Sequence, residues 1–118
     1  MIAHTLGFPR IGLGRELKKA QEAFWKGRIG ERELLDTARA LRMRHWTLQN
    51  EAGIDLLPVG DFSLYDSMLD TTAMLGAIPG RFGWDGGDVD VGTLFRMARG
   101  DGTATAMEMT KWFDTNYH

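Results

Sequence analysis

Residues 4–19 read HTLGFPRIGLGRELKK, in which a short apolar segment meets a turn rich in glycine and then a helix that carries cations in its first turns. In α/β proteins, ligands bind where strands end and the following helices begin. The turn offers backbone N–H groups, a helix N-terminus and the side chains of Arg15, Lys18 and Lys19. This combination predicts a site for an anionic ligand.

Hydrophobic periodicity predicts alternating strands and helices along the rest of the chain. The expected elements are a strand at 2–8, helices at 15–26 and 31–52, a strand at 54–59, a helix at 64–75, a glycine-rich loop at about 76–89, a helix at 91–99 capped by Asp90, and a strand or turn at 107–117. This order is typical of α/β proteins with parallel strands. Because two or three strands cannot close a barrel and would leave a sheet edge bare, we expect part of a barrel and not a finished one.

The same spacing predicts which side chains face the core. They are Leu13, Leu17, Ala20 and Phe24 in the first helix, Leu34, Ala38, Leu41, His45, Leu48 and Ala52 in the second, and Leu64, Met68 and Leu75 in the third. His45 is therefore expected to be a packed histidine and not a ligand. Trp25, Trp46 and Trp112 are expected in the core or along a barrel seam.

The amino-acid composition and the net charge of the chain exclude several classes of function. The 118 residues carry a net charge of −2, which argues against nucleic-acid binding. No apolar run approaches the roughly 20 residues that span a bilayer, and the first residues do not resemble a signal peptide. The chain contains no cysteine, so it offers neither a disulfide nor a thiolate metal site. We expect a cytoplasmic protein of at most one domain, with no membrane or nucleic-acid partner.

The chain resembles the start of the cobalamin-independent methionine synthases in three segments: HTLGFPRIGLGRELKKA, RHWTLQNEAGIDLLPVGDFSLYD and MEMTKWFDTNYH. The resemblance covers nearly the whole chain and is weakest at 77–106. It implies the first, folate-contacting part of a longer methyltransferase built from two (β/α)8 barrels. The fold that the resemblance implies for this chain is therefore α/β, a helix-rich portion of an incomplete (β/α)8 (TIM) barrel with a few parallel strands. That enzyme moves a methyl group from a 5-methyltetrahydrofolate polyglutamate to homocysteine. The resemblance also implies a zinc ion whose ligands lie in the second barrel, with no catalytic or metal-binding residue in this segment.

The resemblance implies specific contacts to the folate polyglutamate. They are Arg15, Glu16, Leu17, Lys18 and Lys111. Judged by sequence pattern alone, cations at the start of a helix are more often a solvated face, but a polyglutamate tail is a string of carboxylates that Arg and Lys bind well. Relatives often carry a basic residue where this chain has Gly14. The absence of that charge would weaken binding of the polyglutamate tail.

Lys19, Arg10 and Asp61 are further possible contacts. Asp61 follows a predicted strand, where barrel enzymes place catalytic groups, but hydrogen bonding within a turn is the simpler role. Arg10 could reach a ligand or pair with Asp55 or Asp61.

An alternative is a free-standing, non-catalytic module that binds polyanionic small molecules or docks on a protein partner. Under the methionine synthase hypothesis, the partner is the C-terminal barrel, and the reading frame continues beyond residue 118 into a further strand. The chain by itself would then be inactive, and it would self-associate through exposed apolar faces and open sheet edges.

Overall fold

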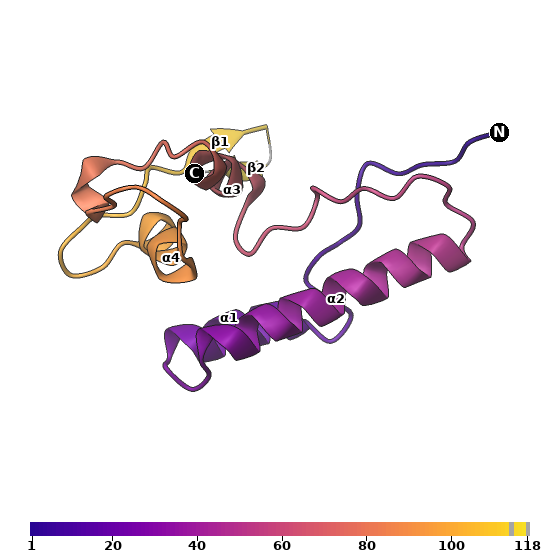
Figure 1. Cartoon of the computed structure of the whole chain (residues 1–118), viewed down its shortest axis with the longest axis horizontal. Coiled ribbons are helices and arrows are strands. Elements are labelled where there is room, and N and C mark those ends of the chain that lie inside the picture. Colours follow the sequence, from indigo (N-terminus) through magenta and orange to yellow (C-terminus); the bar gives the residue numbers. More distant parts are fainter. Residues whose placement is uncertain (114, 118) are drawn as a thin grey trace. The chain divides into compact units, whose positions relative to one another are not determined.

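A computed structural model describes residues 1–113 and 115–117 (Figure 1). The chain divides into two compact units, Met1–Leu64 and Tyr65–His118. No helix among the described residues combines the length and the apolar character needed to span a lipid bilayer.

The first unit is built on two helices, α1 (Glu16–Trp25) and α2 (Glu31–Glu51), which pack against each other. Both agree with the helices predicted at 15–26 and 31–52 to within one residue at each end. Gly27 and Gly53 follow the C-caps of the two helices with φ angles of +66° and +85°, a left-handed conformation that favours glycine and ends a helix.

The core of the first unit lies between the two helices. Leu17, Ala38 and Leu41 form a buried cluster, against which Ile11, Phe62 and Leu64 pack. The predicted inner face of α2 is confirmed at Leu34, Ala38, Leu41 and His45, whereas Leu48 and Ala52 are exposed near the end of the helix.

The prediction that Leu13 faces the core is wrong. Its side chain is 98% exposed. Because α1 begins only at Glu16, Leu13 belongs to the preceding turn, where helical spacing does not determine the direction of a side chain.

The strands predicted at 2–8 and 54–59 are reduced to one parallel bridge between His4 and Leu56. The carbonyl of Ala3 accepts hydrogen bonds from the N–H groups of Asp55 (2.9 Å) and Leu56 (3.1 Å). The Asp55 carboxylate in turn accepts one from the Ala3 N–H at 2.8 Å. The predicted strand lengths are therefore wrong, since neither segment forms a ladder beyond this point.

Among its described residues, the second unit contains two α-helices, a short 3-10 helix and two antiparallel strands. These are α3 (Ser67–Met74), η1 (Gly80–Phe82), α4 (Val91–Arg99), β1 (Thr110–Trp112) and β2 (Thr115–Tyr117).

The expected Asp90 cap is confirmed, because its carboxylate accepts the Thr93 N–H at 2.5 Å. The strand or turn expected at 107–117 is the antiparallel pair β1–β2. Asp66 caps α3 at the Leu69 N–H (2.7 Å), so that helix begins three residues later than predicted.

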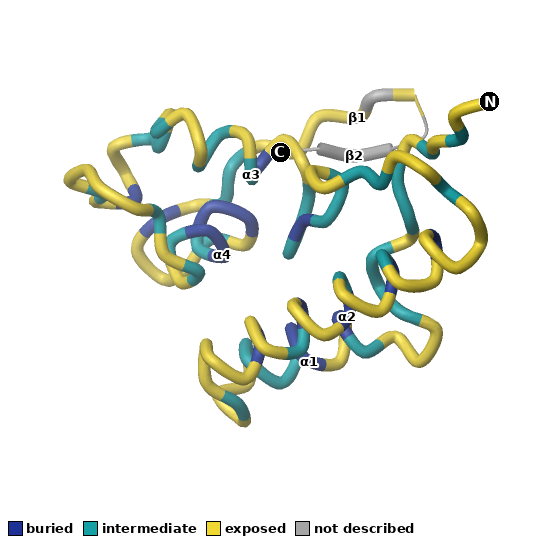
Figure 2. The backbone as a smooth tube through the Cα atoms, turned by 45° about the vertical axis from the view of Figure 1, so that its right-hand side comes forward, coloured by how far each residue is buried: buried dark blue, intermediate teal, exposed yellow. Residues whose placement is uncertain are grey.

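Where burial is described in the second unit, the buried residues come mainly from α4, as the dark blue backbone in Figure 2 shows. They are Leu69, Phe82, Leu94, Phe95, Met97, Ala98 and Ala104. Of the inner face predicted for the third helix, Leu64 does pack against a core, that of the first unit, although it precedes α3. The prediction is wrong at Met68 and Leu75, which are 49% and 72% exposed, and Leu69 is fully buried instead. The helix carries apolar residues on several sides, so periodicity does not single out one face. The expectation for the Trp112 side chain falls outside the described part of the structure.

Candidate anion site at the start of helix α1

Arg15 occupies the N-cap of α1 in the left-handed conformation, with φ +59° and ψ +35°. Residues other than glycine rarely adopt it. The Arg15 N–H donates to the carbonyl of Gly12 at 3.0 Å, and its carbonyl accepts from the Lys19 N–H at 3.0 Å. The backbone is thereby fixed on both sides, while the side chain is exposed.

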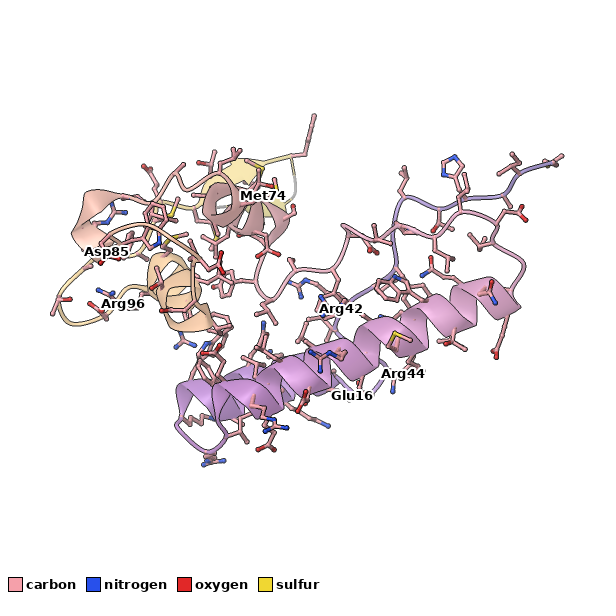
Figure 3. All side chains as sticks on the ribbon, in the orientation of Figure 1. Glu16, Arg42, Arg44, Met74, Asp85 and Arg96 are labelled. Atoms are coloured by element: carbon pink, nitrogen blue, oxygen red, sulfur yellow. The ribbon has the colours of Figure 1, made fainter. Side chains whose placement is uncertain are left out.

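Glu16 uses its carboxylate to hold the turn together. Oε2 accepts the Gly14 N–H at 2.9 Å, and Oε1 accepts Nη2 of Arg44 at 2.8 Å (Figure 3). The hydrogen bond from its own backbone N–H, followed by that from the Arg44 guanidinium, holds the pKa of Glu16 below its ordinary value. Both carboxylate oxygens of Glu16 therefore accept hydrogen bonds from within the protein.

Leu17 is fully buried in the cluster between α1 and α2. Its N–H donates to the carbonyl of Ile11 at 3.1 Å. Both the side chain and the amide are occupied, so Leu17 fixes the first turn of α1 and offers no group to a ligand.

Lys18 projects from the same first turn as Arg15. It forms an ion pair with Glu22 at 3.9 Å, with both side chains about half exposed, and a pair of this kind holds a side chain only weakly. Within the described residues the Lys18 N–H has no acceptor, as is usual for amides in the first turn of a helix. The structure thus brings together two cationic side chains and one free amide. Lys19 follows with an exposed side chain.

Of the other predicted contacts, Lys111 and Asp61 lie far from this turn in the sequence, whereas Arg10 lies within it. Lys111 is exposed on β1 of the second unit, paired in register with Asn116. Asp61 accepts the Phe8 N–H at 2.8 Å. This is a tertiary hydrogen bond between segments 53 residues apart, and not the bond within its own turn that was expected as its simpler role. Arg10 is half-buried in the turn.

A neighbouring pocket of about 220 Å³ lies between the turn and α2. It is lined by Phe8, Pro9, Ile11, Gly12, Leu13, Arg44, His45 and Leu48. Its walls are mainly apolar and none of the α1 cations lines it, so this pocket is separate from the candidate anion site.

Comparison with known proteins identifies the family to which this chain belongs. The family described as "Cobalamin-independent synthase, N-terminal domain" matches residues 2–118. The chain belongs to this synthase family. Its relatives include proteins of Syntrophotalea carbinolica (65% identical over 121 residues, covering 100% of this chain) and Acidithiobacillus ferrooxidans (64% over 115 residues, covering 98%). A third, from Nitratidesulfovibrio vulgaris, is 60% identical over 121 residues and covers the whole chain.

All three relatives are named 5-methyltetrahydropteroyltriglutamate–homocysteine methyltransferase. The synthase-family chain spans only 15–16% of their length.

Two residues of this synthase-family domain take part in the site geometry without having been predicted as site residues. Arg44 lies 28 residues from its partner Glu16, too far for local spacing to reveal the pair. His45, expected only as a packed histidine, is confirmed in that role: it is 5% exposed and lies against the ring of Phe8, with 4.6 Å between ring centroids. Phe8 begins the turn that leads to Arg15. Two adjacent residues of α2 therefore support this turn, Arg44 through Glu16 and His45 through Phe8.

Because of His45, the free energy of unfolding of this synthase-family domain should decrease as the pH decreases. Burial, and then the charge of Arg44, lower the pKa of the imidazole below 6.5, although Glu16 and Asp61 oppose the shift. Folding therefore disfavours the protonated form, and the contribution of His45 is complete above about pH 6.5 and lost as the pH falls through its folded pKa. Urea titrations at pH 8 and pH 5 should show a smaller pH dependence in His45→Gln than in the wild type. An unchanged dependence would assign the effect to other groups.

Proposed function

We propose that this chain forms the first part of the folate-contacting barrel of a methyltransferase. That enzyme transfers the methyl group of a 5-methyltetrahydrofolate polyglutamate to homocysteine, which makes methionine. The observation that carries the proposal is 60–65% identity, over essentially the whole chain, to relatives named for this reaction. The C-terminal barrel of the same enzyme would be its principal partner, and the cytoplasm its location.

The pairing of the first unit supports the barrel proposal. The His4–Leu56 bridge is parallel, and α1 and α2 lie in the connection between its two segments. Parallel segments need such a crossover, which usually contains a helix. Apolar side chains remain exposed on both segments, namely Ile2, Leu6, Leu56 and Val59. We expect further strands to cover them in the longer protein, and we expect the chain by itself to associate through them.

The first turn of α1 supports a role in binding the glutamate tail. Arg15 offers a planar fork of donors to carboxylates, and Lys18 adds a mobile charge and a free backbone N–H. The carboxylate of Glu16 would repel an acidic tail, but its pairing with Arg44 offsets that charge. Lys111 is proposed as a further folate contact, with Lys19 and Arg10 as secondary ones.

The described residues of this chain do not fit a zinc site. Among the described residues, no cluster of three or more His, Asp or Glu side chains could hold a metal ion. His45 is buried against Phe8, and His4 is exposed. We propose that the zinc ion is held outside this chain, which contains no cysteine, and we assign no chemical step to its residues.

Neutralising Arg15 or Lys18 should weaken the use of a triglutamate substrate. The test grafts residues 1–118 in place of the matching segment of the Syntrophotalea carbinolica relative. Arg15→Ala and Lys18→Ala should each cost roughly 1–2 kcal/mol in kcat/KM for the triglutamate, about 5- to 30-fold, because each removes a charge-assisted contact in an exposed site. The loss should be small for the monoglutamate and should shrink as salt rises.

The matched control is Lys26→Ala, which removes an exposed cation at the opposite end of α1. It should leave both substrates unaffected. Equal losses for the two substrates in Arg15→Ala would place this residue at the pterin or in the support of the fold, and the assignment to the tail would be abandoned.

A further inference from the structure

Arg44 connects the middle of α2 to the turn before α1. It donates to one carboxylate oxygen of Glu16 at 2.8 Å, while the other oxygen accepts the Gly14 N–H at 2.9 Å (Figure 3). Arg15 lies between Gly14 and Glu16 in the sequence. The hydrogen bonds of Glu16 therefore bracket the one residue of the turn that combines an exposed cation with a left-handed backbone.

The carboxylate of Glu16 packs closely over Gly12. A Cβ atom at Gly12 would lie 2.1 Å from Oε2 of Glu16 and 2.8 Å from Cδ2 of Leu41, and its φ is +88°. The turn has thus closed around the carboxylate with no space left for a side chain. This close packing allows Glu16 to reach both Arg44 and Gly14.

The left-handed conformation of Arg15 has an energetic cost, because its Cβ crowds the following backbone. Such a conformation persists only where surrounding contacts impose it. Here those contacts are the Gly12 carbonyl, the Lys19 N–H and the bonds of Glu16 on either side. Only the Glu16 carboxylate is held from another element, through Arg44.

We propose that Arg44 and Glu16 are positioning residues, which hold Arg15 in its left-handed conformation and so aim its guanidinium at the carboxylates of the ligand's tail. The inference rests on the proposed function of the anion site. Arg44 acts through Glu16 and Arg15, and the ligand itself does not touch it. Without the ion pair between Arg44 and Glu16, the Arg15 backbone can leave its left-handed conformation. Ligand binding must then also order the Arg15 side chain, and this entropic cost weakens binding.

The experiment uses the chimera described above. Arg44→Gln should raise KM for the triglutamate about fivefold and leave kcat and the monoglutamate KM unchanged. Arg44→Lys should recover part of the loss, because a lysine can still pair with Glu16 as a point charge. Glu16→Gln should shift the triglutamate KM in the same direction.

Arg39→Gln is the matched control. Arg39 lies on the same helix, carries the same charge and pairs with the surface carboxylate of Asp36 at 3.2 Å. It should leave the triglutamate KM unchanged. An equal rise in Arg39→Gln would attribute the effect to net charge and overturn the proposal.

A double-mutant cycle with Arg15→Ala identifies the route. If Arg44 acts through Arg15, Arg44→Gln should have no further effect on the triglutamate KM in the Arg15→Ala background. A loss that persists there would show that Arg44 contacts the ligand or acts by another route, and would overturn the inference. A loss in Arg15→Ala with none in Arg44→Gln also overturns it and leaves the proposed function standing. No loss in Arg15→Ala would reject the tail site itself.

Discussion

Replacing Leu17 with alanine should lower the free energy of unfolding of this chain by about 2–5 kcal/mol. The side chain is fully buried between α1 and α2, against Ala38 and Leu41. Its truncation removes buried methyl groups and leaves a cavity that two packed helices cannot fully close. Urea denaturation followed by far-UV circular dichroism measures the loss.

Leu13→Ala is the matched control, since it makes the same substitution four residues earlier at an exposed position. It should change the free energy of unfolding by no more than about 0.5 kcal/mol. A comparable loss at both positions would show that Leu13 packs against the fold. The expected contrast would show that Leu17, within the segment that resembles a folate site, packs in the core and that Leu13 does not.

Gly100→Ala should destabilise the second unit by about 3 kcal/mol or more. Gly100 follows α4 with φ +70° and ψ −179°, a region essentially restricted to glycine. A Cβ atom there would lie 2.7 Å from the backbone nitrogen of Ala106 and 2.9 Å from the carbonyl oxygen of Ala104. Backbone atoms cannot rotate away as a side chain can, so the segment itself would have to move. A thermal melt of the variant measures the loss.

The neighbouring Gly102→Ala provides the control. No atom lies within 4 Å of a Cβ atom built at this glycine, and its φ is not in the left-handed range. The substitution should change the melting temperature little. If Gly100→Ala were equally silent, the close approach of residues 104–106 to the end of α4 would not exist in solution.

Local sequence signals predicted the helices well and their packed faces less well. The face of α2 from Leu34 to His45 repeats over several turns, so periodicity alone identified it. Leu13 lies in the turn before α1, where helical spacing does not determine the direction of a side chain, and α3 has too many apolar residues for one face to stand out. The strands at 2–8 and 54–59 depend on pairing across about fifty residues, which no local pattern contains.

The candidate site was predictable in its charges but not in its geometry. The cations of the first turn of α1 are visible in the sequence, and the structure places Arg15 and Lys18 together there. The role of Glu16 depends on Arg44 in another helix, and the conformation of Arg15 depends on hydrogen bonds across the turn. These are tertiary interactions, so they emerge only when the chain is folded.

The division of the chain into two compact units has a spectroscopic consequence. Trp25 and Trp46 belong to the first unit, and Trp84 and Trp112 to the second. The indole N–H of Trp46 donates to the carbonyl of Pro58 at 3.1 Å, so its emission is sensitive to the packing of the segment that follows α2. Replacing the two tryptophans of one unit with phenylalanine leaves a chain whose fluorescence reports on the other unit only. Two such variants would show by intrinsic fluorescence whether the halves of this chain melt together or in sequence.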